Sequence, residues 1–105
     1  MAIYELRTYN IYVGKMAEAL ELYRSQGWPA LSRYQDKLVG YFTGDIGGMN
    51  EIVHLWKYED DADRRRHWEA ILADTELMAF AAQIRPLIQS QQNKLLMAAP
   101  FGPHP

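Results

Sequence analysis

The sequence contains no cysteine among its 105 residues. That absence excludes disulfide bonds, thiolate catalysis and cysteine-ligated zinc sites, and it leaves the redox compartment undetermined. No apolar run approaches the roughly 20 residues of a membrane-spanning helix. The strand-like pattern begins at Ile3, which leaves no room for a signal peptide. We therefore expect a cytoplasmic protein with no membrane partner.

The chain also lacks a strong charge of either sign, with 11 basic residues against 13 acidic ones and a net charge of -2. Such a balance gives no general attraction to nucleic acid. Its three histidines, His54, His67 and His104, lack the paired spacing of a local metal motif. Neither a phosphate-binding loop nor a serine-hydrolase elbow is present. We predict no nucleic-acid partner, no metal and no cofactor.

Hydrophobic periodicity predicts four strands and two main helical regions. Alternating residues indicate strands near 3–9, 38–43, 51–58 and 94–98. Three-four spacing predicts a helix from Met16, interrupted at Gly27-Trp28-Pro29 because proline disfavours helical geometry in the residue before it. The order β-α-β-β-α-β predicts an α+β, ferredoxin-like fold, an antiparallel four-stranded sheet with its helices on one face. Residues 1–99 form the single domain and residues 100–105 a short tail.

The second helical region has recognisable starts and a predicted buried stripe. Two helix starts are predicted, the first at Asp60 or Asp61 and the second at Asp74 or Thr75, because the side chains of these residues can accept hydrogen bonds from free backbone amides. Trp68, Ile71 and Leu72 are expected to face the core. The run Arg64-Arg65-Arg66-His67 is interpreted as a solvated face, paired with aspartates one turn earlier.

A sheet with helices on one face leaves its other face uncovered. We expect Tyr4, Leu6, Val53 and Leu55 to face the helices. The opposite face would then hold the following set: Glu5, Arg7, Tyr9, Ile52, His54 and Trp56, with Val39, Tyr41 and Thr43 from the neighbouring strand. Such an aromatic face is unsuited to bare water, and two sheets packed about a two-fold axis would cover it. The sequence therefore predicts a homodimer with a shared cavity.

Chemistry is expected on the same face. His54 is the candidate general acid or base, because an imidazole titrates near neutral pH. Arg7 could clamp a carboxylate, and Tyr9 and Trp56 could stack on a ring. Glu5 and Tyr41 complete the predicted ligand-binding set. In the packing alternative, Arg7 only pairs with Glu5 and Trp56 only fills the dimer interface.

Three stretches of the sequence resemble the NIPSNAP family. They are Leu38-Val39-Gly40-Tyr41-Phe42 with Asp45-Ile46-Gly47, then Val53-His54-Leu55-Trp56-Lys57-Tyr58 with Asp63-Arg64, and Tyr4-Glu5-Leu6-Arg7-Thr8-Tyr9 with Gly14-Lys15. The resemblance covers roughly residues 3–100. The resemblance implies a ferredoxin-like domain that pairs as a dimeric α/β barrel, and the biochemical activity of the family is poorly defined.

Two function classes follow. The first is a barrel cavity that binds a small aromatic or carboxylate-bearing molecule, with His54 moving a proton. By fold analogy, its chemistry would be that of a cofactor-free oxygenase, isomerase or cyclase. The second is a non-enzymatic dimeric binding or scaffold protein. A haem held by His54 is a third, weaker interpretation.

Overall fold

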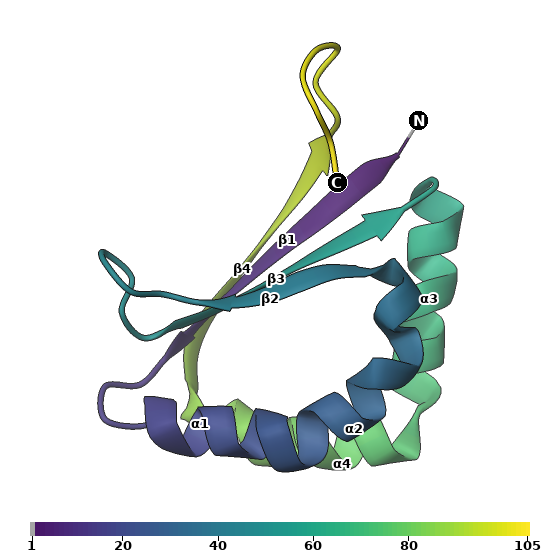
Figure 1. The fold of residues 1–105 in the computed structure, drawn as a ribbon. Coiled ribbons are helices and arrows are strands. Elements are labelled where there is room, and N and C mark those ends of the chain that lie inside the picture. The colour runs from purple at the N-terminus through teal and green to yellow at the C-terminus, as the bar shows by residue number, and fades with distance from the viewer. Residues whose placement is uncertain (1) are drawn as a thin grey trace.

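Four antiparallel strands form one sheet in the spatial order β2-β3-β1-β4. The computed structural model describes residues 2–105. The strands are β1 (Ile3–Ile11), β2 (Leu38–Thr43), β3 (Glu51–Tyr58) and β4 (Ile88–Met97). The helices are α1 (Met16–Leu22), α2 (Trp28–Leu31), α3 (Asp61–Ala73) and α4 (Thr75–Ile84). Figure 1 shows these helices gathered on one side of the sheet, which confirms the predicted α+β, ferredoxin-like architecture.

The predicted interruption of the first helical region is wrong. Both residues before the proline keep helical backbone angles: Gly27 has φ -68° and ψ -54°, and Trp28 has φ -63° and ψ -43°. A widened π-helical turn at Tyr23–Gly27 precedes Pro29. Because a π turn shifts the hydrogen bonds by one residue, the proline ring avoids the clash that it causes in a regular helix. One bent helical segment therefore runs from α1 into α2.

Gly27 also allows this segment to approach α4 closely. A Cβ atom at Gly27 would lie only 2.7 Å from Cζ of Phe80. Any larger residue would require the Phe80 ring or the helices themselves to shift. The close approach brings the bent segment onto the same core that α4 covers.

Both predicted helix starts are confirmed. The side chain of Asp60 accepts a 2.8 Å hydrogen bond from the amide of Asp63, and that of Asp74 accepts one of 3.1 Å from Leu77. The predicted burial of Leu72 is wrong, since this side chain is 67% exposed. Residues spaced four apart, Asp63, His67 and Ile71, form the buried stripe of α3 instead.

Strand β4 begins at Ile88, six residues before the predicted start at 94. Its first half is polar, Gln89-Ser90-Gln91-Gln92-Asn93, and exposed. Because these residues are all polar, they show no alternation of apolar and polar positions from which a strand could be predicted. Pairing with β1 nonetheless extends through it, with Asn10 opposite Ser90 and Thr8 opposite Gln92. Backbone pairing with β1 therefore determines that these residues form a strand, because the intrinsic preference of side chains for strands is weak.

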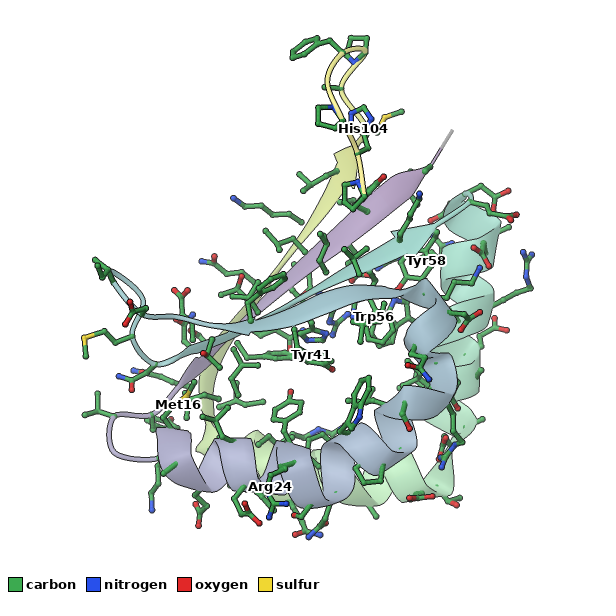
Figure 2. The ribbon with its side chains drawn as sticks, viewed as in Figure 1. Met16, Arg24, Tyr41, Trp56, Tyr58 and His104 are labelled. Atoms are coloured by element: carbon green, nitrogen blue, oxygen red, sulfur yellow. The ribbon has the colours of Figure 1, made fainter. Side chains whose placement is uncertain are left out.

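The predicted assignment of the two sheet faces is reversed. Ile52, His54, Trp56 and Tyr58 alternate along β3 and all are buried. Their ring and alkyl groups meet the helices, as Figure 2 shows for Trp56 and Tyr58. Period-two alternation separates the two sets of residues but does not say which set faces the helices.

The other strands follow the same register. Glu5 pairs with Trp56, Arg7 with His54, and Tyr9 with Ile52, so all share the helix-covered face. Tyr41 pairs with His54, and Thr43 with Ile52. The open face instead carries the four residues predicted to meet the helices, Tyr4, Leu6, Val53 and Leu55. Val39 is exposed at an irregularity between Leu38 and Gly40.

The tail after β4 folds back over one end of the open face (Figure 1). The backbone oxygen of Pro105 accepts hydrogen bonds from the hydroxyl of Tyr4 at 2.8 Å and from Nζ of Lys57 at 3.0 Å. Tyr4 is thereby buried. Within residues 2–105, none of the helices has the length and apolar character needed to cross a membrane.

Candidate functional site

A cavity of about 220 Å³ lies between the sheet and the helices. Its walls include Arg7, Tyr9, Tyr41, His54, Trp56 and Trp68. Figure 2 shows Tyr41 and Trp56 pointing from the sheet toward the helical layer. The cavity therefore belongs to one chain, whereas the predicted one was shared between two.

His54 is held in one orientation by its neighbours. Its Nδ1 atom accepts a 2.7 Å hydrogen bond from the indole Nε1 of Trp56. The ring of Tyr41 stacks on the imidazole at 4.8 Å between centroids and 11° between planes. The ring of Tyr9 lies 5.0 Å away, tilted by 36°. Since Nδ1 accepts, the neutral imidazole carries its proton on Nε2.

The Nε2 atom of His54 is buried and has no hydrogen-bond partner among residues 2–105. Burial, and secondarily the positive charge of Arg7, lower the pKa of His54 to about 3. The imidazole is therefore neutral at physiological pH. The ring nitrogen of His54 that is left without a partner is therefore a hydrogen-bond donor rather than a positive charge or a free lone pair.

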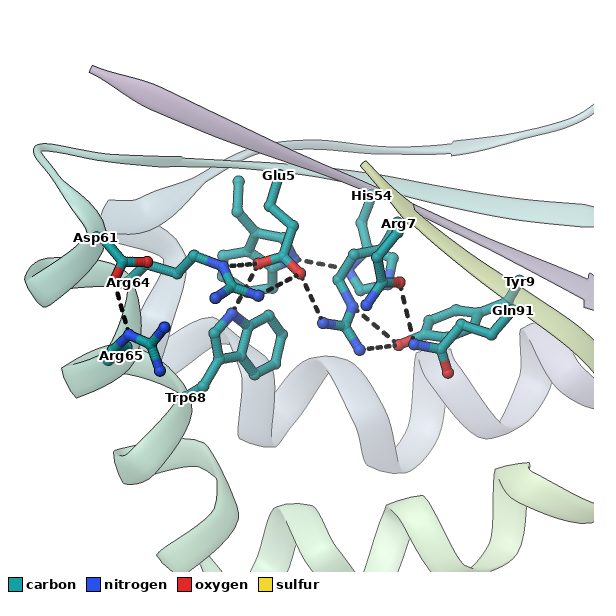
Figure 3. A network of polar contacts seen from close by, with 11 residues as sticks. Glu5, Arg7, Tyr9, His54, Asp61, Arg64, Arg65, Trp68 and Gln91 are labelled. Atoms are coloured by element: carbon teal, nitrogen blue, oxygen red, sulfur yellow. Dashed lines mark hydrogen bonds and ion pairs between the residues drawn. The ribbon is translucent and has the colours of Figure 1, made fainter. Parts of the chain in front are cut away.

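Glu5 is fully buried behind the cavity, where three side chains donate to its carboxylate. Figure 3 shows this network. Arg7 Nη1 donates at 2.9 Å, Arg64 Nε at 3.0 Å and Trp68 Nε1 at 2.8 Å. Burial acts to raise the pKa of Glu5, but the hydrogen bonds from Arg64 and Trp68 and the charges of both arginines bring the pKa below its usual value. The carboxylate of Glu5 is thus ionised and fixes the positions of Arg7, Arg64 and Trp68.

Arg7 is fixed by contacts on several sides. Its guanidinium lies 4.2 Å from the centroid of the Trp68 ring. Its Nε and Nη2 atoms donate to the hydroxyl of Tyr9 at 3.1 and 3.0 Å, and Nη1 is paired with Glu5. A planar guanidinium stacked and paired in this way is well ordered. Arg7 and Arg85 both line the cavity, and the described residues that line it include no acidic side chain.

All six side chains predicted for the site lie on one face of the sheet. Five of them line the cavity, and Glu5 holds Arg7 from behind. Sequence reasoning missed three neighbours, Arg64, Trp68 and Tyr23. Arg64 and Trp68 are four residues apart on one face of α3, a spacing that could have indicated a shared contact.

The interpretation of 64–67 as a solvated face is wrong in part. Arg65 does pair with Asp61, at 2.7 Å. Arg64 instead reaches the buried Glu5, and His67 is itself buried against Trp56 and Tyr58. Within residues 2–105, no three His, Asp or Glu side chains are grouped so that they could hold a metal ion.

Comparison with known proteins gives one consistent family. The NIPSNAP profile matches residues 4–103. The chain is 32% identical over 100 residues to Protein NipSnap homolog 3A of Homo sapiens, an alignment covering 93% of this chain and 40% of that protein. The chain thus spans about two fifths of the length of this curated relative.

Solved structures agree with this result. A NIPSNAP family protein from Agrobacterium tumefaciens superposes with a TM-score of 0.90 and 34% identity, covering 98% of both chains. SnoaB of Streptomyces nogalater, described as a cofactor-independent oxygenase, superposes with a TM-score of 0.65 and 18% identity, also covering 98% of both chains. At that identity the second likeness shows a shared fold alone.

Proposed function

Because the chain belongs to the NIPSNAP family, a membership that defines its fold but no reaction, we propose its function from the cavity. The protein binds a small aromatic or carboxylate-bearing molecule between its sheet and its helices. The Nε2–H group of His54 donates a hydrogen bond to an oxygen of that molecule. Arg7 supplies a positive charge beside it.

The observation that carries this proposal is the unpartnered Nε2 atom of His54. The side chain is only 4% exposed, and it lines the cavity. A buried donor without an acceptor costs about 1–3 kcal/mol. An oxygen atom of a bound ligand would remove this cost, so the site is suited to a ligand with an acceptor at this place.

The chemistry of the walls narrows the ligand class. Arg7 and Arg85 line the cavity, and the lining described includes no acidic side chain. Arg7 and Arg64 share the one negative charge of Glu5, so this group keeps a net positive charge, which favours an anion or an oxygen that becomes negative. The rings of Tyr9, Tyr41 and Trp68 favour a flat apolar body, because aromatic faces stack on one another. An aromatic carboxylate or an enolisable aromatic ketone meets both demands.

The proposed role of His54 differs from the general acid or base suggested by the sequence. A base needs a free lone pair, but Nδ1 of His54 is occupied by Trp56 and Nε2 carries the proton. A neutral imidazole that donates to a carbonyl oxygen stabilises negative charge developing there. If a reaction occurs, His54 would therefore act on the oxyanion and another group would take the proton.

We also propose that two copies pack through their open sheet faces. Leu6, Val53 and Leu55 lie half-buried on this face, and Phe42 beside them is exposed. The tail covers only the end near Tyr4. A second copy would bury the remaining apolar surface by an isologous contact.

The binding proposal is tested with benzoate and its neutral analogue benzamide, titrated into the purified protein and followed by backbone amide shifts. Benzoate should bind about tenfold tighter, because a hydrogen bond to a charged group is worth more than one to a neutral group. His54→Phe should weaken benzoate binding about tenfold or more. His67→Phe is the matched control, since His67 is also a buried imidazole but does not line the cavity. Equal binding of the two compounds, or equal effects of the two variants, would contradict the proposal.

A further inference from the structure

A second hollow, of about 360 Å³, lies between the bent α1–α2 segment and strand β2. We call it the outer cleft. Its walls are mainly Leu20, Tyr23, Trp28, Leu31, Tyr41 and Phe42. It therefore opens at the edge of the sheet, on the side where β2 has no further strand neighbour.

The outer cleft is apolar and partly open to solvent. Leu20 is 40% exposed and Trp28 is 42% exposed. Grouped exposed apolar side chains of this kind often mark a ligand groove. The one charged residue of its lining, Arg24, turns to Glu21, to which its Nε donates at 2.9 Å. The cleft thus offers contact surface to a neutral apolar group.

The outer cleft adjoins the cavity that holds His54. Tyr23, Leu31 and Tyr41 line both hollows. One face of the Tyr41 ring stacks on His54, while Trp28 meets the ring edge-on at 6.5 Å between centroids. The ring centroids of Tyr23 and Tyr41 lie 5.7 Å apart. Tyr41 is therefore a wall shared by a polar compartment and an apolar one.

We propose that the outer cleft is a second subsite, and that the protein takes an elongated aromatic anion. This inference rests on the proposed function. The anionic head lies between Arg7 and His54, and the flat apolar body passes Tyr41 into the outer cleft. A molecule with one ring fills only the inner cavity, whereas a second ring in line with the first reaches Leu20 and Trp28.

The test compares benzoate with biphenyl-4-carboxylate, which carries the same head and a second ring. Burial of the second ring should make biphenyl-4-carboxylate bind about tenfold tighter or better. Leu20→Trp fills the outer cleft from α1 and should remove this gain while leaving benzoate affinity unchanged. Ala17→Trp is the matched control, because Ala17 is exposed on the same helix and does not line the cleft.

A second measurement needs no variant. In the complex with the natural chain, nuclear Overhauser contacts should join the outer ring of the probe to the methyl groups of Leu20. Equal affinities for the two carboxylates, a gain that survives Leu20→Trp, or an outer ring without contacts to Leu20 would each overturn the second subsite and leave the proposed function standing. Failure of both carboxylates to bind would overturn the proposed function, and the second subsite with it.

Discussion

The indole nitrogen of Trp56 donates a 2.7 Å hydrogen bond to Nδ1 of His54, two residues earlier on the same strand. Because both residues face the helices, the bond is buried and lies beside the cavity. It fixes which nitrogen of His54 carries the proton. The indole of Trp56 thereby leaves the imidazole with an N–H donor at Nε2.

His54 should remain neutral between about pH 5 and pH 8, because burial and the charge of Arg7 lower its pKa to about 3. Nitrogen-15 spectra of histidine-labelled protein should show an Nε2–H tautomer that does not change over this range. A midpoint near the ordinary histidine value would contradict the assignment.

The same shift has a consequence for stability. The unfolded chain takes up the His54 proton near pH 6.5 and the folded one only near pH 3, so protonation favours the unfolded state. The free energy of unfolding should therefore fall as pH decreases from about 6.5 toward 3. His67, whose pKa burial lowers to about 4, acts in the same direction. Denaturation at a series of pH values should show a shallower fall in His54→Phe than in the unchanged chain.

Trp56→Ala should lower the free energy of unfolding by about 3–5 kcal/mol, because it removes a large side chain that is completely buried. It should not weaken a dimer, since Trp56 lies away from the open sheet face. Denaturant unfolding and light scattering measure the two effects separately. Trp28→Ala is the control and should cost less, as Trp28 is partly exposed. If Trp56→Ala abolished the dimer without changing the free energy of unfolding, Trp56 would have to lie in the dimer interface.

Glu5→Gln should destabilise the protein by about 3 kcal/mol, because it leaves Arg7 and Arg64 without their buried counter-charge. Glu21→Gln breaks the exposed pair with Arg24 and should change stability little. Chemical denaturation of both variants gives the comparison. A similar decrease in the free energy of unfolding in both variants would mean that the Glu5 network does not stabilise the fold as predicted.

Val53→Glu should convert a dimer to monomers, because it places a charge in the middle of the open sheet face. Ile46→Glu provides the control in the exposed loop between β2 and β3. Size-exclusion chromatography with light scattering reports the mass of each. A natural chain that is monomeric, or a Val53→Glu dimer, would remove the proposed interface.

Patterns among residues close together in the sequence predicted the helices and strands well. Contacts between residues far apart in the sequence were missed. The aspartate caps at 60 and 74 depend on backbone amides three residues away, so the sequence contains all that is needed to predict them. Alternation along β3 correctly grouped His54 with Trp56 but could not say which side the helices cover. The pair of Glu5 with Arg64 joins residues 59 positions apart, and no local pattern predicts such a contact.

The Nε2–H group of His54 is the proposed donor to an anionic oxygen in the cavity. The most direct test is the histidine nitrogen-15 spectrum recorded with and without benzoate. A downfield shift and slower exchange of the His54 Nε2–H proton, absent with benzamide at the same concentration, is the result that the structure predicts. An Nε2–H resonance unchanged while benzoate is bound would contradict the claim.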